Sequence, residues 1–284
     1  DFAGITVDTS SEGGQTGLWL IDPVDLTVDA AAAATISSNL ASNNVSLQTT
    51  NSSASGPGNQ SAGDGDITIN SGITWTSTNT LTLNAYNDIA INAAIDGQNG
   101  GLTLLAYGNS GTAAVGTIST GAAGAVDVDN FALTRGVWDQ VGAGLPDFAT
   151  NALSVGFGTF IRAQGGDGTF SNPYALFDVY GLQGITTSDR RGGGSGDISL
   201  YYELANDIDA SMTSSWNNGA GFDPVSFSGS LDGKGHTIDG LYINRPSEGN
   251  VALISYWQDN YFTSGRDLEI KDLTLTNASV TGDN

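Results

Sequence analysis

The chain has 284 residues, with 30 acidic against 8 basic side chains and a formal net charge of −22. Such an acidic surface repels nucleic acid and anionic membranes, because binding phosphate requires lysine and arginine. Cysteine is absent, and there is one histidine and one methionine. The sequence therefore offers no disulfide framework and few ligands for a transition metal or haem. No apolar run approaches the ~20 residues of a membrane-spanning helix, so we expect neither a nucleic-acid partner nor membrane insertion.

The first 130 residues contain short apolar segments that alternate with Thr, Ser and Asn, which is the pattern of β-strands. The alanine run at 29–34 is too short for a helix that is stable by itself. The strand segments are LTV at 26–28, VSL at 45–47, ITI at 67–69, LTL at 81–83, IAI at 89–91 and LTL at 102–104.

These segments recur at a nearly constant distance along the chain. Steps of about 20 residues lead from Leu26 to Val45, Ile67 and Ile89, and a second series leads from Leu81 to Leu102. A repeat with two or three short strands and almost no helix predicts a parallel β-helix. A β-sandwich also contains many short strands but requires no fixed period, so we favour the all-β solenoid.

The composition and the alternation of apolar residues change after residue 130. The segment 131–200 is rich in aromatic residues and glycine and interrupts the repeat. We interpret it as an irregular excursion or inserted subdomain. Alternation resumes in 201–284 and persists to the last residue, so we expect β-helix strands at 1–130, an insertion at 131–200, and resumed strands at 201–284 that continue beyond the chain.

Several segments carry a resemblance to a known family. TGLWLIDPVDLTV (16–28) contains a Gly-x-Trp-Leu-Ile-Asp-Pro run, and ITWTSTNTLTLNAYNDIAINAAI (73–95) looks like the repeat that follows it. The later segments are GTFIRAQGGDGTFSNPYALFDVYGLQGI (158–185), YELANDIDASMTSSWNNGAGFDPV (202–225) and FSGSLDGKGHTIDGLYINRPS (227–247), the last similar to GLUG-type repeats. Together they resemble the filamentous haemagglutinin-like exoproteins of two-partner (type V) secretion systems.

The resemblance implies a right-handed parallel β-helix that is exported through an outer-membrane transporter to the bacterial cell surface or the extracellular space. The secretion domain of that family carries an Asn-Pro-Asn-Gly-type motif, and no such tetrapeptide occurs here. We therefore expect an internal segment that lacks the N-terminal secretion domain.

The stretch LDGKGHTIDGLYI (231–243) contains the histidine of the chain. Asp232, His236 and Asp239 are candidates for glycoside chemistry, in which one carboxyl group protonates the leaving oxygen and another activates water. The glycines beside the aspartates favour a tight turn instead. We interpret the stretch as a corner that leads into a strand, with no catalytic residues.

Two Asp-x-Asp runs are candidates for calcium, which binds several carboxylate and carbonyl oxygens. Asp64 and Asp66 form one pair, and Asp127 and Asp129 form the other. Neither run has the glycine-rich periodicity of calcium-binding β-rolls, so we expect no obligatory cofactor and keep calcium as an open alternative.

Aromatic side chains in the irregular part could stack on an extracellular glycan, although packing beside the β-helix is the simpler interpretation. The candidates are Trp138, Tyr174, Tyr180, Trp216 and Trp257.

The sequence thus favours a non-enzymatic stalk or fibre segment of a secreted adhesin that mediates attachment or matrix formation. Its partners would be an extracellular glycan or protein, or further copies assembled into fibres. One alternative is a polysaccharide-active β-helix enzyme, a lyase or hydrolase. Another is the stalk of a haem-acquisition or contact-dependent toxin exoprotein.

Overall fold

The computed structural model describes residues 4–9, 17–50, 63–108, 115–185, 200–258 and 269–283, with the backbone alone at 227–228 and 257–258. They form two compact units. As far as its residues are described, unit 1 takes in Asp1–Asp139 and Pro146–Gly158, and unit 2 takes in Gln140–Leu145, Thr159–Arg190 and Gly194–Asn284.

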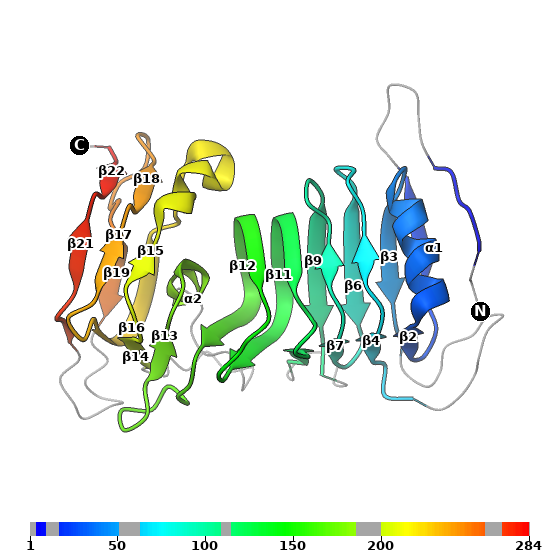
Figure 1. Cartoon of the computed structure of the whole chain (residues 1–284), viewed down its shortest axis with the longest axis horizontal. Coiled ribbons are helices and arrows are strands. Elements are labelled where there is room, and N and C mark those ends of the chain that lie inside the picture. Colours follow the sequence, from blue (N-terminus) through cyan, green and yellow to red (C-terminus); the bar gives the residue numbers. More distant parts are fainter. Residues whose placement is uncertain are drawn as a thin grey trace. The chain divides into compact units, whose positions relative to one another are not determined.

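Unit 1 consists mainly of short parallel strands (Figure 1). They are β1 (Leu18–Ile21), β2 (Leu26–Val28), β3 (Asn44–Gln48), β4 (Ile67–Ile69), β5 (Ile73–Thr74), β6 (Thr80–Ala85), β7 (Ile89–Ile91), β8 (Ile95–Asp96), β9 (Gly101–Ala106) and β10 (Thr117–Thr120). Two longer strands follow, β11 (Val126–Val141) and β12 (Phe148–Ala163).

In the middle of unit 1 the strands follow one another in two sets of three, β4 to β6 and β7 to β9, and each strand of the first set pairs with its counterpart in the second. Ile67 is the register partner of Ile89, Ile73 that of Ile95, and Leu81 that of Leu102. The inward positions therefore stack in columns, and Leu81, Leu83, Leu102 and Leu104 are fully buried. Alternation with period two produces this apolar interior, because successive side chains of a strand point to opposite faces.

The structure confirms the predicted steps from Ile67 to Ile89 and from Leu81 to Leu102. The predicted steps from Leu26 to Val45 and from Val45 to Ile67 are wrong, since Leu26 pairs with Ile67 and Val45 pairs with Leu81. The helix α1 (Ala30–Leu40) lies between β2 and β3. These two strands do not pair with each other, since β2 pairs with β4 and β3 pairs with β6.

Helix α1 extends well beyond the alanine run. The side chain of Asp29 caps its N-terminus by accepting a hydrogen bond from the backbone N–H of Ala32 at 2.9 Å. Ala33, Ile36 and Leu40 are buried, and the helix contacts β2, β3 and β5 (Figure 1). Tertiary packing therefore stabilises a helix that its sequence alone would not.

Regular strands continue into the segment that we expected to be irregular. β11 and β12 occupy most of 126–163. The aromatic residues that interrupt the alternation lie in the core of unit 1, where Trp138 packs edge-on against Phe131 and Phe148 at centroid distances of 5.2 and 5.5 Å. The division of the chain at 130 and 200 stays a prediction.

Unit 2 is built in the same way. Its elements are β13 (Tyr174–Leu176), α2 (Val179–Gly184), β14 (Leu200–Leu204), β15 (Ile208–Asp209), the 3-10 segment η1 (Ser211–Gly219), β16 (Val225–Asp232), β17 (Thr237–Asp239), β18 (Tyr242–Asn244), β19 (Ile254–Gln258), β20 (Ile270–Lys271), β21 (Thr274–Thr276) and β22 (Ser279–Thr281).

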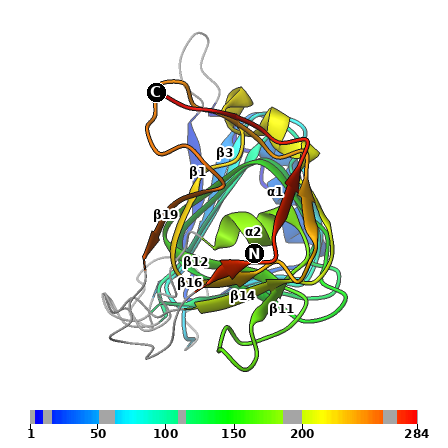
Figure 2. The same ribbon diagram turned by 90° about the vertical axis from the view of Figure 1, so that its left-hand side faces the viewer.

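Parallel stacks form in unit 2 from β13, β14, β16 and β20, from β15, β17 and β21, and from β18 and β22, while β19 pairs with the first half of β16. Seen end-on in Figure 2, these strands surround a common interior, and α2 lies inside the outline. Every residue of α2 is buried.

The described residues thus form a mostly β protein with parallel sheets, an arrangement compatible with an all-β solenoid. None of the helices in the described ranges has the length and apolar character required to cross a membrane.

Candidate functional site

A groove of about 270 Å³ lies on the outer side of unit 2, over β14, β16 and β20. Aromatic and proline side chains line one part of it, namely Phe170, Pro173, Tyr201 and Tyr202. Polar and charged side chains line the rest, namely Glu203, Ser230, Asp232, Lys234, Glu269 and Lys271. A more open hollow of about 550 Å³ shares Asp232 and Lys234 with the groove.

Strand register places the charged side chains of the groove beside one another. Glu203 on β14 is the register partner of Asp232 on β16, which is in turn the register partner of Lys271 on β20. The preceding position on β16 is Leu231, which is fully buried. Because side chains alternate along a strand, Asp232 and its partners point outward. The fold therefore presents a row of charged groups on the outer face of a parallel sheet.

Opposite charges alternate within the groove. The Nζ atom of Lys234 lies 3.7 Å from Oε2 of Glu203 and 4.0 Å from Oδ2 of Asp232. The Nζ atom of Lys271 lies 2.9 Å from Oε2 of Glu269, and the hydrogen bond and charge of Glu269 raise the pKa of Lys271. Exposed ion pairs of this kind contribute little to folding stability. A polar ligand can therefore replace these contacts with its own hydrogen bonds at a small cost in free energy.

A tight turn positions Lys234. Its backbone N–H donates to Oδ1 of Asp232 at 2.9 Å, and its φ of 53° is left-handed. The N–H of Gly233 donates to the carbonyl of Lys271 at 2.8 Å, which fastens the turn to the next strand. The predicted corner at Asp232–Gly235 is thus present, with a lysine at a backbone conformation that suits glycine or asparagine better.

The other two residues of the catalytic hypothesis have separate partners. Nδ1 of His236 lies 3.2 Å from Oδ1 of Asp207. The backbone N–H of Thr237, together with the hydrogen bond of His236, lowers the pKa of Asp207. Oδ1 of Asp239 accepts hydrogen bonds from Thr276 and Asn277. Of the three candidates, Asp232 lines the groove.

The calcium candidates are distributed over unit 1. Oδ1 of Asp66 accepts from the side chain of Asn87 at 2.7 Å and from the N–H of Asp88. Asp129 accepts from Asn151 and Asn130. Within the ranges that the structure describes, no three His, Asp or Glu side chains group as a metal site.

Asp127 lies beside another carboxylate, since its register partner on β8 is Asp96. Asp127 is an exposed residue, and partial desolvation of its carboxylate, followed by the charge of Asp96, raises its pKa. Oδ1 of Asp96 is buried and has no hydrogen-bond partner among the described residues. Asp64, the fourth candidate, is exposed.

The aromatic candidates for ligand stacking are core residues. Trp138, Tyr174, Tyr180 and Trp216 are buried, and Tyr180 stacks on Trp216 at a centroid distance of 5.1 Å. Their surfaces are therefore covered by the protein itself, which favours packing, the simpler interpretation, over stacking on a ligand for these four. The side chain of Trp257 lies outside the described residues.

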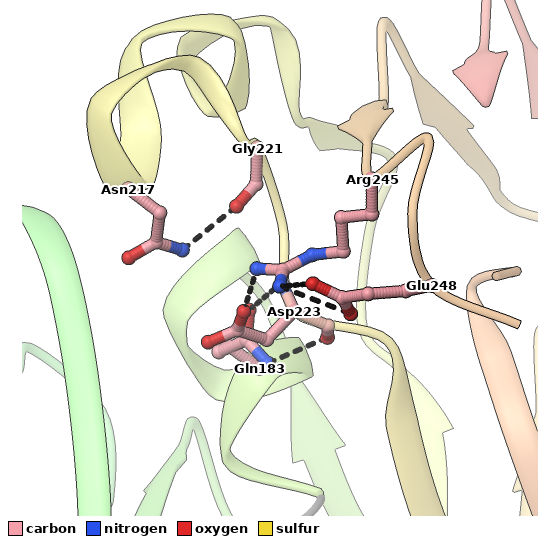
Figure 3. Close-up of polar contacts among 6 residues, drawn as sticks. All are labelled: Gln183, Asn217, Gly221, Asp223, Arg245 and Glu248. Carbon is pink, nitrogen blue, oxygen red and sulfur yellow. Dashed lines mark hydrogen bonds and ion pairs between the residues drawn. The ribbon is translucent and has the colours of Figure 1, made fainter. Parts of the chain in front are cut away.

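A second polar cluster surrounds Arg245 (Figure 3). Its guanidinium pairs with Asp223 and, at 3.0 Å, with Glu248. Burial raises the pKa of Asp223 and outweighs the opposite effect of Arg245. The side chain of Gln183 on α2 exchanges two hydrogen bonds of 2.9 Å with the backbone of Asp223.

Asn217, in the left-handed part of η1, donates to the carbonyl of Gly221 at 2.7 Å (Figure 3). Since each of these groups bonds another element of the same unit, we interpret the Arg245 cluster as a structural fastening. It joins α2 and the segments before β16 and after β18.

Sequence reasoning missed most of the groove, naming Asp232 for a different role. A usable signal was present: the chain has two lysines, Lys234 and Lys271. Both line the same groove of a strongly acidic protein. The two lysines are separated by about one set of strands. Recognition of the longer repeat in unit 2 would therefore have placed them next to each other.

By its fold, the chain belongs to the broad class of mostly β proteins with stacked parallel strands. It is 40% identical over 135 residues to Halomucin of Haloquadratum walsbyi (strain DSM 16790 / HBSQ001). The match covers 44% of this chain and 1% of Halomucin, so the chain spans about one hundredth of the length of that relative. No protein family model matches the chain, and no solved structure matches it.

Proposed function

We propose that the chain is a right-handed parallel β-helix that serves as a stalk or fibre segment of a large extracellular adhesin. The observation that carries the proposal is the stacking of parallel strands in register within each unit, for example Leu81 on Leu102 and Ile238 on Leu275. A solenoid of this kind lengthens by about 5 Å for each set of strands. Its stacked strands form a rigid support that holds binding surfaces away from the cell.

Composition supports an extracellular rod. The net charge of −22 opposes edge-to-edge pairing of a strand-rich object. The similarity to a segment that makes up 1% of Halomucin supports membership in a much larger protein. Export through an outer-membrane transporter rests on the resemblance to filamentous haemagglutinin-like exoproteins. Attachment through a glycan or protein ligand, or through self-association, belongs to the same proposal.

Deletion of whole sets of strands tests the solenoid and the stalk together. Removing residues 67–88 takes out β4, β5 and β6 and brings β2 into register with β7. We expect this variant to fold and, in the full-length protein, to retain cell attachment. Removing 67–77 instead leaves half a set and is expected to unfold unit 1. Equal unfolding by both deletions would contradict the solenoid, and unchanged attachment after removal of the entire segment would contradict the stalk.

A polysaccharide-active enzyme is the alternative, and the place of Asp232 in the groove is the observation that favours it. Incubation of the purified chain with acidic and neutral polysaccharides, followed by an assay of reducing ends, separates the two functions. A structural segment releases no product. Product that disappears in Asp232→Asn would replace the structural proposal with an enzymatic one.

A further inference from the structure

The groove over β14, β16 and β20 combines two features, both lysines of the chain and an exposed aromatic ring. The two lysines of the sequence both line it, although the chain carries a net charge of −22. Phe170 lines it with 55% of its surface exposed, packed edge-on against Tyr201 at a centroid distance of 5.3 Å. An exposed aromatic ring beside convergent donors and acceptors is typical of a ligand site.

The conformation of Lys234 is a second, independent observation. A lysine with a φ of 53° is strained, and glycine or asparagine would relieve the strain. Residues in such conformations concentrate at ligand clamps, because the side chain is needed where the backbone places it. Here the backbone aims Lys234 between Glu203 and Asp232, which lie on adjacent strands.

We propose that this groove binds a short stretch of a neutral, β-1,4-linked glycan. The C–H face of a sugar ring stacks on Phe170, since the negative face of an aromatic ring attracts the polarised C–H groups. Sugar hydroxyls donate hydrogen bonds to the carboxylates of Glu203 and Asp232. They accept hydrogen bonds from the ammonium groups of Lys234 and Lys271, and both kinds are charge-assisted.

The charge and shape of the groove select among sugars. Three carboxylates and two ammonium groups line it, so a polyanionic chain of uronates or sulfated sugars is repelled by the groove and by the whole surface. The floor is a parallel sheet whose strands lie ~4.8 Å apart. From β14 to β20 it offers an open surface about two strand spacings wide, which suits the extended ribbon of a β-1,4-linked chain better than a helical α-linked one.

This glycan site deepens the proposed attachment to an extracellular glycan and rests on that part of the proposed function, whereas a stalk without the site would still fold and project. The test uses the purified chain with cellotetraose and chitotetraose as probes, followed by isothermal titration and saturation-transfer NMR. Maltotetraose is the α-linked control, and tetragalacturonate is the charged control. We expect saturable binding of at least one β-linked probe and weaker binding of both controls.

Single-residue variants test whether the sugar binds in this groove. Phe170→Ala is expected to weaken the binding of the β-linked probe about tenfold. Phe157→Ala removes a phenylalanine that is 78% exposed in unit 1, outside the groove, and should leave the affinity unchanged. Lys234→Asn removes the ammonium group while tolerating the left-handed backbone. It should weaken binding several-fold without lowering the unfolding temperature.

Three results would overturn the proposal. They are no saturable binding of either β-linked probe, a control sugar that binds as tightly as the β-linked probes, and unchanged affinity in either Phe170→Ala or Lys234→Asn. None of them bears on the deletion test of the stalk, so the two proposals can fail separately.

Discussion

Gly229 occupies a place in β16 where a side chain has no room. Its φ is 153°, and a Cβ atom there would lie 1.9 Å from the carbonyl oxygen of Leu200. Gly142 has nearly the same backbone, with a φ of 145°, but nothing within 4 Å of a Cβ atom. Gly142→Ala should therefore cost roughly 1–3 kcal/mol for the backbone conformation alone.

Gly229→Ala adds a steric clash, and we expect a further loss of about 1–3 kcal/mol in the free energy of unfolding. Urea denaturation of the two variants measures this difference. Equal losses would show that β14 and β16 approach less closely than the structure has them.

The pair of Asp96 and Asp127 predicts a dependence on pH. Because partial desolvation and the charge of Asp96 raise the pKa of Asp127, the folded state favours its neutral form. The stability from this group is present at low pH and is lost as the pH rises through the folded pKa. Asp127→Asn should therefore stabilise the protein at pH 7, by no more than a few tenths of a kcal/mol because solvent screens the pair.

At pH 3, below the ordinary carboxyl pKa of 3.8, the gain from Asp127→Asn should vanish. Thermal unfolding at both pH values measures the effect, with Asp64→Asn as a control that removes the same charge at another exposed position of unit 1. A gain at pH 7 no larger than that of Asp64→Asn would contradict the carboxylate pair.

Single residues were the hardest level to predict. The turn around Lys234 was predictable, because Asp-Gly and Lys-Gly pairs specify a reversal without any tertiary contact. The exact place of Trp138 and Tyr174 was not, since a broken pattern favours packing for an aromatic residue but does not say against which strands. Only the register of β10 with β11 and of β13 with β14 decides that they are buried.

Helix α2 shows how one element depends on another. Oδ1 of Asp178 caps the helix through the N–H of Gly181, and Oδ2 accepts a hydrogen bond of 2.6 Å from the buried Arg162. Asp178→Ala removes this ion pair with a buried arginine, and we expect a loss of about 3–5 kcal/mol.

The matched variant is Asp29→Ala in α1. Asp29 caps its helix in the same way, through the N–H of Ala32, and its removal should cost about 1 kcal/mol. Chemical denaturation of the two variants compares them. Similar losses would mean that the ion pair with Arg162 contributes nothing beyond the cap.

Elements with strict alternation were predictable and those defined by packing were not. β4, β6, β7 and β9 follow directly from their alternating triplets. Helix α1 extends to Leu40 because Ile36 and Leu40 reach the core, and local propensity does not contain that information.

At the scale of the whole molecule, the large negative net charge opposes folding. With 30 acidic and 8 basic residues, the folded chain repels itself. Salt shortens the range of this repulsion, from ~10 Å at 0.1 M to ~3 Å at 1 M. The unfolding temperature should rise when NaCl is increased from about 0.1 to 1 M, as differential scanning calorimetry can show. A falling or constant unfolding temperature would mean that attractive ion pairs outweigh the repulsion.

The repeat itself was the most informative feature of the sequence at this scale. The steps from Ile67 to Ile89 and from Leu81 to Leu102 correspond to real strand pairs. The spacing between Leu26 and Val45 matches by coincidence, because the residues of α1 fill the interval. A repeat in the sequence indicates that strands stack. Which strands pair with one another depends on the length and structure of the segments that connect them.

The central claim is that strands one repeat apart lie side by side, in parallel and in register. Since the chain has no cysteine, pairs of introduced cysteines test it directly. Thr82 and Thr103 are register partners on β6 and β9 in unit 1, and Thr237 and Thr274 are register partners on β17 and β21 in unit 2. Adjacent parallel strands bring such residues within the range of a disulfide.

Under mild oxidation, the double variants Thr82→Cys with Thr103→Cys and Thr237→Cys with Thr274→Cys should each form an intramolecular disulfide. Thr82→Cys with Ala132→Cys should not, because Ala132 pairs with Thr103 and lies one strand further on. Rapid cross-linking of both register pairs, with none in the distant pair, is the result that the solenoid predicts. Failure of the register pairs, or equal cross-linking in all three, would contradict it.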